Sequence, residues 1–169
     1  MGHFAEMARQ RGGREFEAWQ SIAGPIRDAA TLAEVFVRLQ TAYGERPALT
    51  MAWTGAPDGA VECLSHARLG AEVMRAANHF RRLGVGPNDP VLFLALPTPE
   101  AYFGFWGAQV AGTVVPVNPF LSITALVDIA LAVGARVLFA SSAAISPLCA
   151  QKAAEIVARC PGMRLVLCD

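Results

Sequence analysis

From Pro90 to Cys168 the chain alternates between short apolar runs of strand length and longer segments with the periodicity of a helix. The runs are PVLFLALP, TVVPV, ARVLFA and MRLVLC, and the segments between them begin at Pro99, Ile123 and Pro147. Strands that are joined through helices lie parallel in one sheet, with the helices on its faces and right-handed crossovers between them. The alternation therefore predicts an α/β fold with a βαβαβαβ parallel-sheet unit.

The helices of this unit carry start and stop signals. Thr98-Pro99-Glu100 combines an N-cap, a proline at the first helical position and an early acid, and the helix it opens extends to Ala111. Ser122 caps a helix that ends at Gly134. In the last helix, PLCAQKAAEIVARC, a charged face turned to solvent is expected at Lys152, Glu155 and Arg159.

A β-hairpin is predicted upstream of the parallel unit. PALTMAW and AVECL alternate like half-buried strands, and Asp58-Gly59 is the strongest part of the turn cluster between them. The alternation places Leu49, Met51 and Trp53 on one face of the first strand, and Val61 and Cys63 on one face of the second.

Two further helices flank the hairpin. Thr31-Leu32-Ala33-Glu34 is a capping box that opens a helix ending near Tyr43. Ser65 can cap the second helix, and Gly84 stands at the position where a C-terminal glycine is expected. Its apolar stripe is formed by Leu69, Val73, Ala76, Phe80 and Leu83, opposite Glu72, Arg75, His79 and Arg82.

The stretch from Trp106 to Leu121 contains no charged residue, which raises the question of a membrane span. A spanning helix needs about 20 apolar residues in unbroken helical geometry. Gly107, Gly112 and two prolines interrupt this stretch, so a helix followed by a buried strand is favoured and no membrane span is expected.

Composition limits the classes of function. The 169 residues are 54% hydrophobic and 17% charged, enough for a packed core, and 14 basic residues balance 14 acidic ones. No basic surface for nucleic acid is expected from this balance. Residues 1–30 are expected to be a loosely ordered leader, because the acids among the first 20 residues argue against a transit peptide.

The four cysteines, Cys63, Cys149, Cys160 and Cys168, form no C-x-x-C pair and have no histidine at a ligand spacing. They are interpreted as reduced thiols and small buried hydrophobes in a cytoplasmic protein, and no metal site is expected.

Two segments invite comparison with phosphate loops. Gly84–Asp89 follows a helix and precedes a strand, the reverse of the order that a phosphate loop requires, and is expected to be a connection. Ser141–Ser146 has the right order but lacks the glycines and the lysine of such loops. Lys152, the only lysine of the chain, lies too far into the following helix and is expected on its charged face.

Isolated polar residues complete the set of candidates. His66 and His79 are thirteen residues apart on one helix, too far to share a metal ion. Asp89, Glu100 and Asp128 are single carboxylates with capping or solubilising roles. No complete catalytic constellation is present, and no catalytic, cofactor-binding or metal-binding residue is assigned.

The order of the segments resembles the N-terminal part of the AMP-forming acyl-CoA synthetases of the adenylate-forming superfamily. The resemblance extends from Leu32 to Asp169 and is sharpest in WGAQVAGTVVPVNPFL. The ending NPFL, Asn118–Leu121, is most similar to the fatty- and medium-chain branch. The chain departs from the family pattern at Asn88-Asp89-Pro90-Val91 and at Pro97-Thr98, two positions without a chemical role in the family.

The resemblance implies that residues 31–169 are the N-terminal portion of a larger, truncated AMP-binding synthetase domain. The complete enzyme would use ATP, Mg²⁺ and coenzyme A to activate a carboxylic acid, with its catalytic motifs downstream of this segment. The chain alone is thus expected to bind no cofactor and to be catalytically incomplete. The alternatives are a non-enzymatic α/β binding or interaction module derived from the family and, more distantly, a membrane-associated protein. The apolar final strand, the nearly uncharged helices and the zero net charge also predict self-association.

Overall fold

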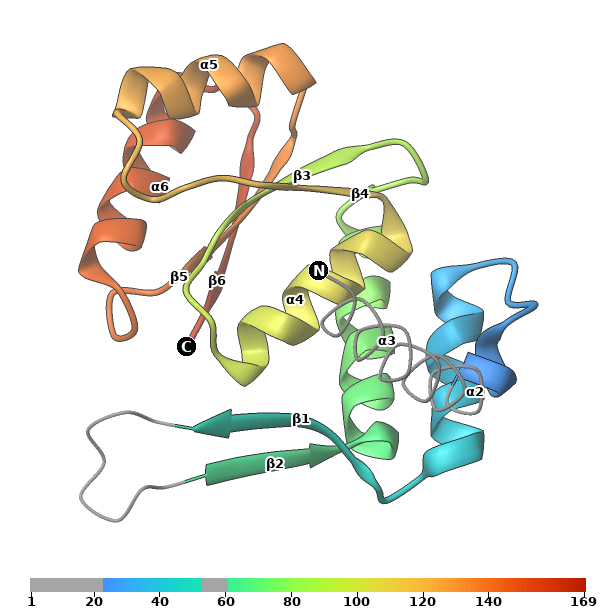
Figure 1. Ribbon diagram of the computed structural model, residues 1–169. Coiled ribbons are helices and arrows are strands. Elements are labelled where there is room, and N and C mark those ends of the chain that lie inside the picture. Colours follow the sequence, from blue (N-terminus) through green and yellow to red (C-terminus); the bar gives the residue numbers. More distant parts are fainter. Residues whose placement is uncertain (1–22, 53–60) are drawn as a thin grey trace, which may run out of the picture.

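The computed structural model describes residues 23–52 and 61–169. Its centre is a parallel sheet with the strand order β4-β3-β5-β6 (Figure 1). This confirms the predicted βαβαβαβ unit, whose strands are β3 (Pro90–Leu94), β4 (Thr113–Pro116), β5 (Val137–Ser141) and β6 (Arg164–Cys168). Strands β3 and β5 are central and almost fully buried, as expected for continuous apolar runs.

Helices cover both faces of this sheet (Figure 1). On one face lie α3 and α4, and on the other lie α5 and α6. The bounds of the helices are η1 Gly24–Ile26, α2 Leu32–Tyr43, α3 His66–Arg82, α4 Pro99–Ala111, α5 Ile123–Val133 and α6 Pro147–Arg159. Within the described residues, no helix is both long and apolar enough to cross a membrane.

The helix boundaries follow from local hydrogen bonds that the sequence encodes. The side chains of Thr31, Ser65, Thr98 and Ser122 each accept a hydrogen bond from the backbone N–H three residues later. At the other end, α5 stops where Gly134 adopts a left-handed conformation with φ of 69°, which is strained for residues with a Cβ. The predicted caps are therefore confirmed.

Two apolar clusters fill the space on either side of the sheet. On the side of α5 and α6, Leu92, Leu94, Leu126, Leu138 and Ile156 are completely buried. On the side of α3 and α4, the cluster is built around Phe80, Val91, Ala108 and Phe139. Cys149 and Cys160 belong to the first cluster and Cys168 to the second, whereas Cys63 is exposed, so the interpretation as buried hydrophobes is wrong for Cys63.

The hairpin is present but buries a different face of its second strand than the sequence indicated. Strands β1 (Pro47–Ala52) and β2 (Val61–Ser65) pair antiparallel. Val61 and Cys63 are exposed, and Leu64 is completely buried. The prediction failed because this strand enters α3 directly, so Leu64 packs inward. Trp53 and the predicted Asp58-Gly59 turn lie outside the described residues.

The buried residues of helix α3 are Gly70, Val73, Ala77 and Phe80. Val73 and Phe80 were predicted, whereas Gly70 and Ala77 are buried in place of their neighbours Leu69 and Ala76. Gly70 allows close approach of α2, because a Cβ there would lie 2.6 Å from two side-chain carbons of Gln40. The Gln40 amide donates to the Ala67 carbonyl at 2.9 Å and fixes this approach. Of the expected leader, residues 1–22 lie outside the described part.

Candidate functional site

The loops that follow β3, β4 and β5 gather at one edge of the sheet, because the carboxyl ends of parallel strands lie together (Figure 1). They are residues 95–98, 117–122 and 142–146. In open α/β sheets ligands bind at this edge. Each loop leads into the N-terminus of a helix, and the three helices are α4, α5 and α6.

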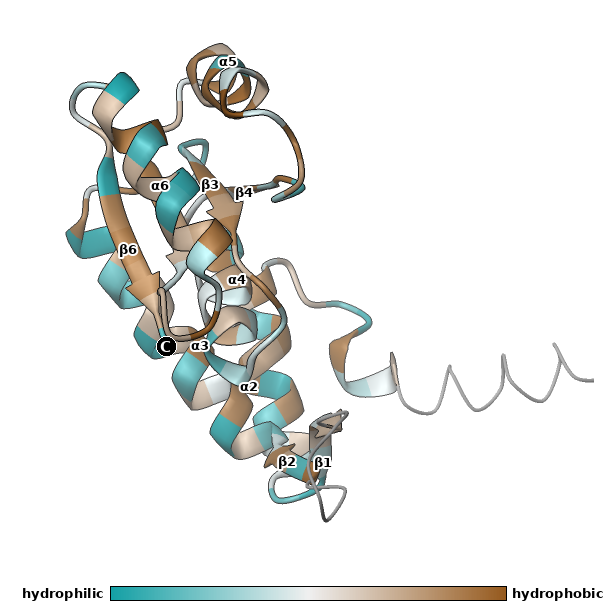
Figure 2. Cartoon of the chain, turned by 90° about the vertical axis from the view of Figure 1, so that its left-hand side faces the viewer, coloured by the Kyte–Doolittle hydropathy of each residue, from teal (hydrophilic) through white to brown (hydrophobic). Residues whose placement is uncertain are grey.

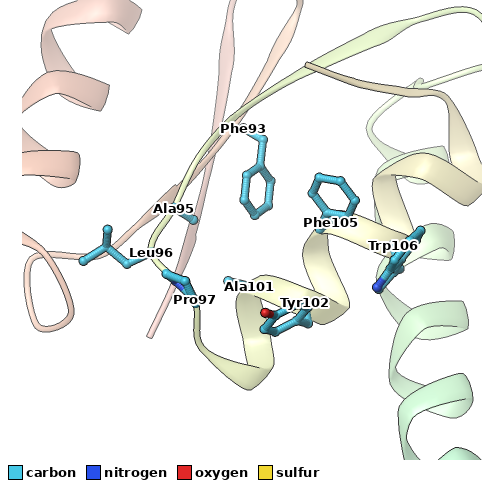
Figure 3. A pocket seen from close by; sticks show the side chains of 8 residues that line it. All are labelled: Phe93, Ala95, Leu96, Pro97, Ala101, Tyr102, Phe105 and Trp106. Carbon is cyan, nitrogen blue, oxygen red and sulfur yellow. The ribbon is translucent and has the colours of Figure 1, made fainter. Parts of the chain in front are cut away.

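An aromatic pocket opens beside the end of β3. It has a volume of about 200 Å³ and is almost entirely apolar. Figure 3 shows Phe93 of β3 directed toward Phe105 of α4, with Tyr102 and Trp106 on the same helix. The rest of the lining is Ala95, Leu96, Pro97 and Ala101. Such a surface suits an apolar or aromatic group and offers no charged partner to an anion.

Ring contacts connect the wall of this pocket to the sheet and to α2. Phe93 stacks on Phe139 with ring centroids 5.2 Å apart and an interplanar angle of 7°. On its other side Phe93 meets Phe105 edge-on at 5.3 Å, and Phe105 meets Trp106 edge-on at 5.2 Å. The contacts continue from Trp106 to Phe36 of α2 at 6.0 Å. The rings thus connect the sheet, α4 and α2 in one continuous cluster.

The Ser141–Ser146 loop forms the turn from β5 into α6. The N–H of Ser142 donates to the carbonyl of Cys168 at 2.8 Å, and the N–H groups of Ile145 and Ser146 both donate to the carbonyl of Ser142. The Ser146 hydroxyl accepts from Cys149 N at 3.2 Å and caps α6. A phosphate loop must instead leave its N–H groups free for the ligand. In this structure the N–H groups of Ser142, Ile145 and Ser146 are instead bonded within the protein.

Two adjacent serines of this loop differ in their hydrogen bonding. The Ser141 hydroxyl is completely buried and accepts from the N–H of Leu96 at 2.9 Å, which ties the β3 loop to β5. Ser142 is also buried, but its hydroxyl oxygen has no partner. Nearby, burial raises the pKa of the Cys168 thiol to about 11, which makes this cysteine a poor nucleophile at neutral pH.

Lys152 is half-buried on α6, and its ammonium group is bonded to a neighbouring loop, which the sequence did not indicate. Its ammonium group donates to the carbonyl oxygens of Pro119 at 2.7 Å and Leu121 at 2.6 Å, in the loop between β4 and α5. The turn is also held by its own residues, because the Asn118 side chain accepts from Phe120 N at 2.9 Å. The only lysine of the chain thus secures a loop at the carboxyl edge of the sheet.

The Gly84–Asp89 segment connects α3 to β3, as predicted. It is closed by a hydrogen bond from Gly86 N to the Asp89 carboxylate at 2.7 Å. This connection lies at the amino ends of the strands, opposite the loops described above.

The remaining candidate residues lie at separate places in the fold and form no common site. His66 packs against the ring of Tyr43, where burial lowers its pKa, and His79 is exposed on α3. Asp128 is exposed on α5, and Glu100 lies exposed in the first turn of α4. Among residues 23–52 and 61–169, no three histidine, cysteine or acidic side chains form a group that could hold a metal ion.

Sequence reasoning missed the aromatic pocket. Its signal was present as three aromatic residues, Tyr102, Phe105 and Trp106, spaced by three and by one in α4. The apolar character of α4 is spread around the helix, so no periodicity marked one face as a ligand surface.

The comparison with protein-family models matches residues 36–167 to the AMP-binding enzyme family. The chain is 29% identical over 114 residues to a marinolic acid–CoA ligase of Pseudoalteromonas sp. (strain SANK 73390), which covers 68% of this chain and 17% of that protein. It is 32% identical over 121 residues to 4-coumarate–CoA ligase 3 of Oryza sativa subsp. japonica, and this match covers 71% of this chain and 21% of that protein.

The fold is similar to that of a solved benzoate CoA ligase from Burkholderia xenovorans LB400. The TM-score is 0.65 at 22% identity, with 82% of this chain and 26% of that chain covered. This likeness confirms the fold, a hairpin followed by a parallel sheet with alternating helices. The chain spans only about a fifth of the length of the curated relatives, 17% of one and 21% of the other.

Proposed function

This chain belongs to the AMP-binding enzyme family, and on that premise we propose that it is part of an acyl-CoA synthetase. Such an enzyme joins a carboxylic acid to coenzyme A and converts ATP to AMP and pyrophosphate. The observation that carries the proposal is the family match over residues 36–167, which includes the whole parallel sheet except the final residue of β6. Two relatives named as CoA ligases support it.

The role of this part is structural support for the chemistry of a larger enzyme. The Ser141–Ser146 loop uses the N–H groups of Ser142, Ile145 and Ser146 internally, and Lys152 is engaged by two carbonyls. ATP, Mg²⁺ and coenzyme A would thus be held by residues outside the described part of this chain. We infer that the chain by itself does not catalyse the reaction.

The proposed substrate is a carboxylic acid with an apolar body, and fatty acids are preferred over acetate. This preference rests on the resemblance of Asn118–Leu121 to the fatty- and medium-chain branch. Aromatic acids are the competing class, because relatives are named for 4-coumarate and benzoate. The proposed location is the cytoplasm, on the ground that the four cysteines are free thiols.

Exchange of labelled pyrophosphate into ATP tests this function. The 169-residue chain should show no carboxylate-dependent exchange, and a longer polypeptide that contains it should show exchange with fatty acids and little with acetate. Exchange with 4-coumarate or benzoate but not with fatty acids would assign the aromatic class. Exchange driven only by amino acids, or by no carboxylate in a folded longer polypeptide, would contradict the proposal.

A further inference from the structure

Strand β3 is mostly hydrophobic and lies inside the sheet, yet its one aromatic ring, that of Phe93, is only partly buried (Figure 2). Its neighbours Val91, Leu92 and Leu94 are completely buried. Val91 and Phe93 point to the same face of the sheet, because side chains alternate along a strand. The apolar cluster on the side of α3 and α4 therefore closes over Val91 but leaves Phe93 accessible from the aromatic pocket.

The aromatic pocket is formed by one continuous stretch of the chain. All of its lining residues lie between Phe93 and Trp106, at the end of β3, in the loop that follows and in the first turns of α4. Among the described residues, no other strand or helix contributes to the lining. The hollow is therefore a property of this strand, loop and helix.

The size of the pocket fits one aromatic ring. Its volume of about 200 Å³ lies below the roughly 300–1,000 Å³ of sites for drug-sized ligands and above the roughly 150 Å³ of an apolar cavity that binds benzene. A bound ring can meet Phe93, Phe105 and Trp106 edge-on, as these rings already meet one another. A long alkyl chain would gain no such ring contacts, and most of its length would remain outside a hollow of this size.

Two polar groups belong to the apolar lining, the hydroxyl of Tyr102 and the indole N–H of Trp106. Neither group is bonded to another residue of the described part of the chain. Figure 3 shows the Tyr102 oxygen on the side of its ring that lies near Ala101 and Pro97. No charged side chain lines the pocket, so a carboxylate or an ammonium group would lose its hydration without gaining a partner. A neutral ligand with a hydroxyl group is therefore favoured.

From these features we propose that the aromatic pocket binds a neutral phenolic compound with a single ring. The ring lies against Phe93, Phe105 and Trp106, and the hydroxyl of the ligand shares a hydrogen bond with that of Tyr102. Such a compound has no carboxylate and is not a substrate of the proposed synthetase reaction. The pocket is thus an additional binding site of this chain.

Fluorine NMR of 4-fluorophenol with the 169-residue chain measures the affinity, and unlabelled compounds serve as competitors. The expected dissociation constant is about 1 mM or lower. Cyclohexanol has a similar size and one hydroxyl, but it should compete about threefold more weakly than phenol or worse, because it makes no ring contacts. Benzoate should compete about tenfold more weakly or worse at neutral pH, because the pocket holds no cation.

Substitutions in the lining locate the site. Ala95→Leu should weaken the binding of 4-fluorophenol by about tenfold or more, because the larger side chain occupies the hollow. The matched control is Ala132→Leu, since Ala132 is exposed on α5 on the other side of the sheet, and it should leave the affinity unchanged. Tyr102→Phe tests the hydrogen bond even if Ala95→Leu does not fold. It should weaken the binding of phenol by about threefold and leave that of benzene unchanged.

Several outcomes would overturn the proposal. They are no binding of 4-fluorophenol at about 10 mM, competition by cyclohexanol equal to that by phenol, and equal effects of Ala95→Leu and Ala132→Leu. Unchanged binding of phenol in Tyr102→Phe would contradict the hydrogen bond to the ligand. Benzoate that competes as well as phenol would contradict the neutral class of ligand and assign the pocket to aryl carboxylic acids.

Discussion

The ammonium nitrogen of Lys152 lies 2.6 Å from the carbonyl oxygen of Leu121, across 31 residues of sequence. A second hydrogen bond of 2.7 Å reaches Pro119 in the same loop. The α6 helix thereby holds the connection between β4 and α5, whose next residue, Ser122, caps α5. The exposed aromatic residue Phe120 stands between the two bonded carbonyls and is presented in a fixed turn.

Replacement of Lys152 by methionine should therefore destabilise the fold. The substitution keeps the apolar stem but removes two charge-assisted hydrogen bonds, so the free energy of unfolding should fall by about 1–3 kcal/mol. Urea unfolding followed by circular dichroism measures the difference. Gln151→Met is the control, because Gln151 is exposed and bonds only within α6. Equal stability of the two variants would show that the Lys152 bonds contribute nothing.

The neighbouring hydroxyls of Ser141 and Ser142 should respond in opposite ways to removal. Ser141→Ala leaves the part-buried N–H of Leu96 without its acceptor and should cost about 1 kcal/mol of unfolding free energy. Ser142→Ala removes an oxygen that has no partner, so stability should change by less than about 0.5 kcal/mol or increase. Chemical denaturation of both variants measures the two changes in unfolding free energy. A larger loss for Ser142→Ala would indicate that its hydroxyl has a partner in solution.

The helix bounds were predictable because they depend on neighbours in sequence. Helices α4 and α5 begin and end where Thr98, Ala111, Ser122 and Gly134 indicated. A cap joins groups three residues apart, and a left-handed glycine terminates a helix whatever lies elsewhere in the chain.

Features that depend on contacts between residues far apart in the chain could not be predicted from the sequence. The strand order β4-β3-β5-β6 is set by packing between segments far apart in the chain. The helix periodicity places Lys152 beside Glu155 on the charged side of α6, but it could not show that the carbonyls of Pro119 and Leu121 bind its ammonium group. The aromatic pocket likewise exists only after Phe93 of β3 meets Phe105 of α4. Periodicity identifies an exposed face of a helix but not what another segment places on it.

Gly104 should not tolerate a larger residue. A Cβ at this position would lie 2.2 Å from Cζ of Phe139, whose ring is held by Phe93 on one face and contacts Phe80. Gly104→Ala gains about 1 kcal/mol of helix propensity but must displace a packed ring, so a net loss of about 1–3 kcal/mol in unfolding free energy is expected. In a double-mutant cycle, Phe139→Leu should recover part of the loss. Strict additivity of the two substitutions would exclude this contact as the cause.

The cysteines should differ sharply in reactivity. Cys63 is exposed, whereas the pKa of Cys168 is raised to about 11, so only about one in a thousand Cys168 thiols is ionised at pH 8. Titration of the native protein with a chromogenic disulfide should show one fast thiol, lost in Cys63→Ser, and four in denaturant. A fast thiol that persists in Cys63→Ser would contradict the burial of the other three.

The same pKa shift predicts a pH dependence of stability. Because the folded pKa of Cys168 lies above its unfolded value, its contribution is complete below about pH 9 and is lost as pH rises through about 11. The urea midpoint should fall across this range, and it should fall less in Cys168→Ala.

The 169-residue chain should bind ATP no more tightly than a dissociation constant of about 1 mM, equivalent to about −4 kcal/mol. A phosphate group needs free N–H donors at a helix N-terminus and a cation within reach. In this chain the N–H groups of Ser142, Ile145 and Ser146 already have acceptors, and the ammonium group of Lys152 is bonded to Pro119 and Leu121. Isothermal titration calorimetry measures the affinity, and Lys152→Met serves as the comparison, since it should leave the weak binding unchanged. Micromolar affinity that disappears in Lys152→Met would show that the Ser141–Ser146 loop rearranges around phosphate, and would move the nucleotide site into this chain.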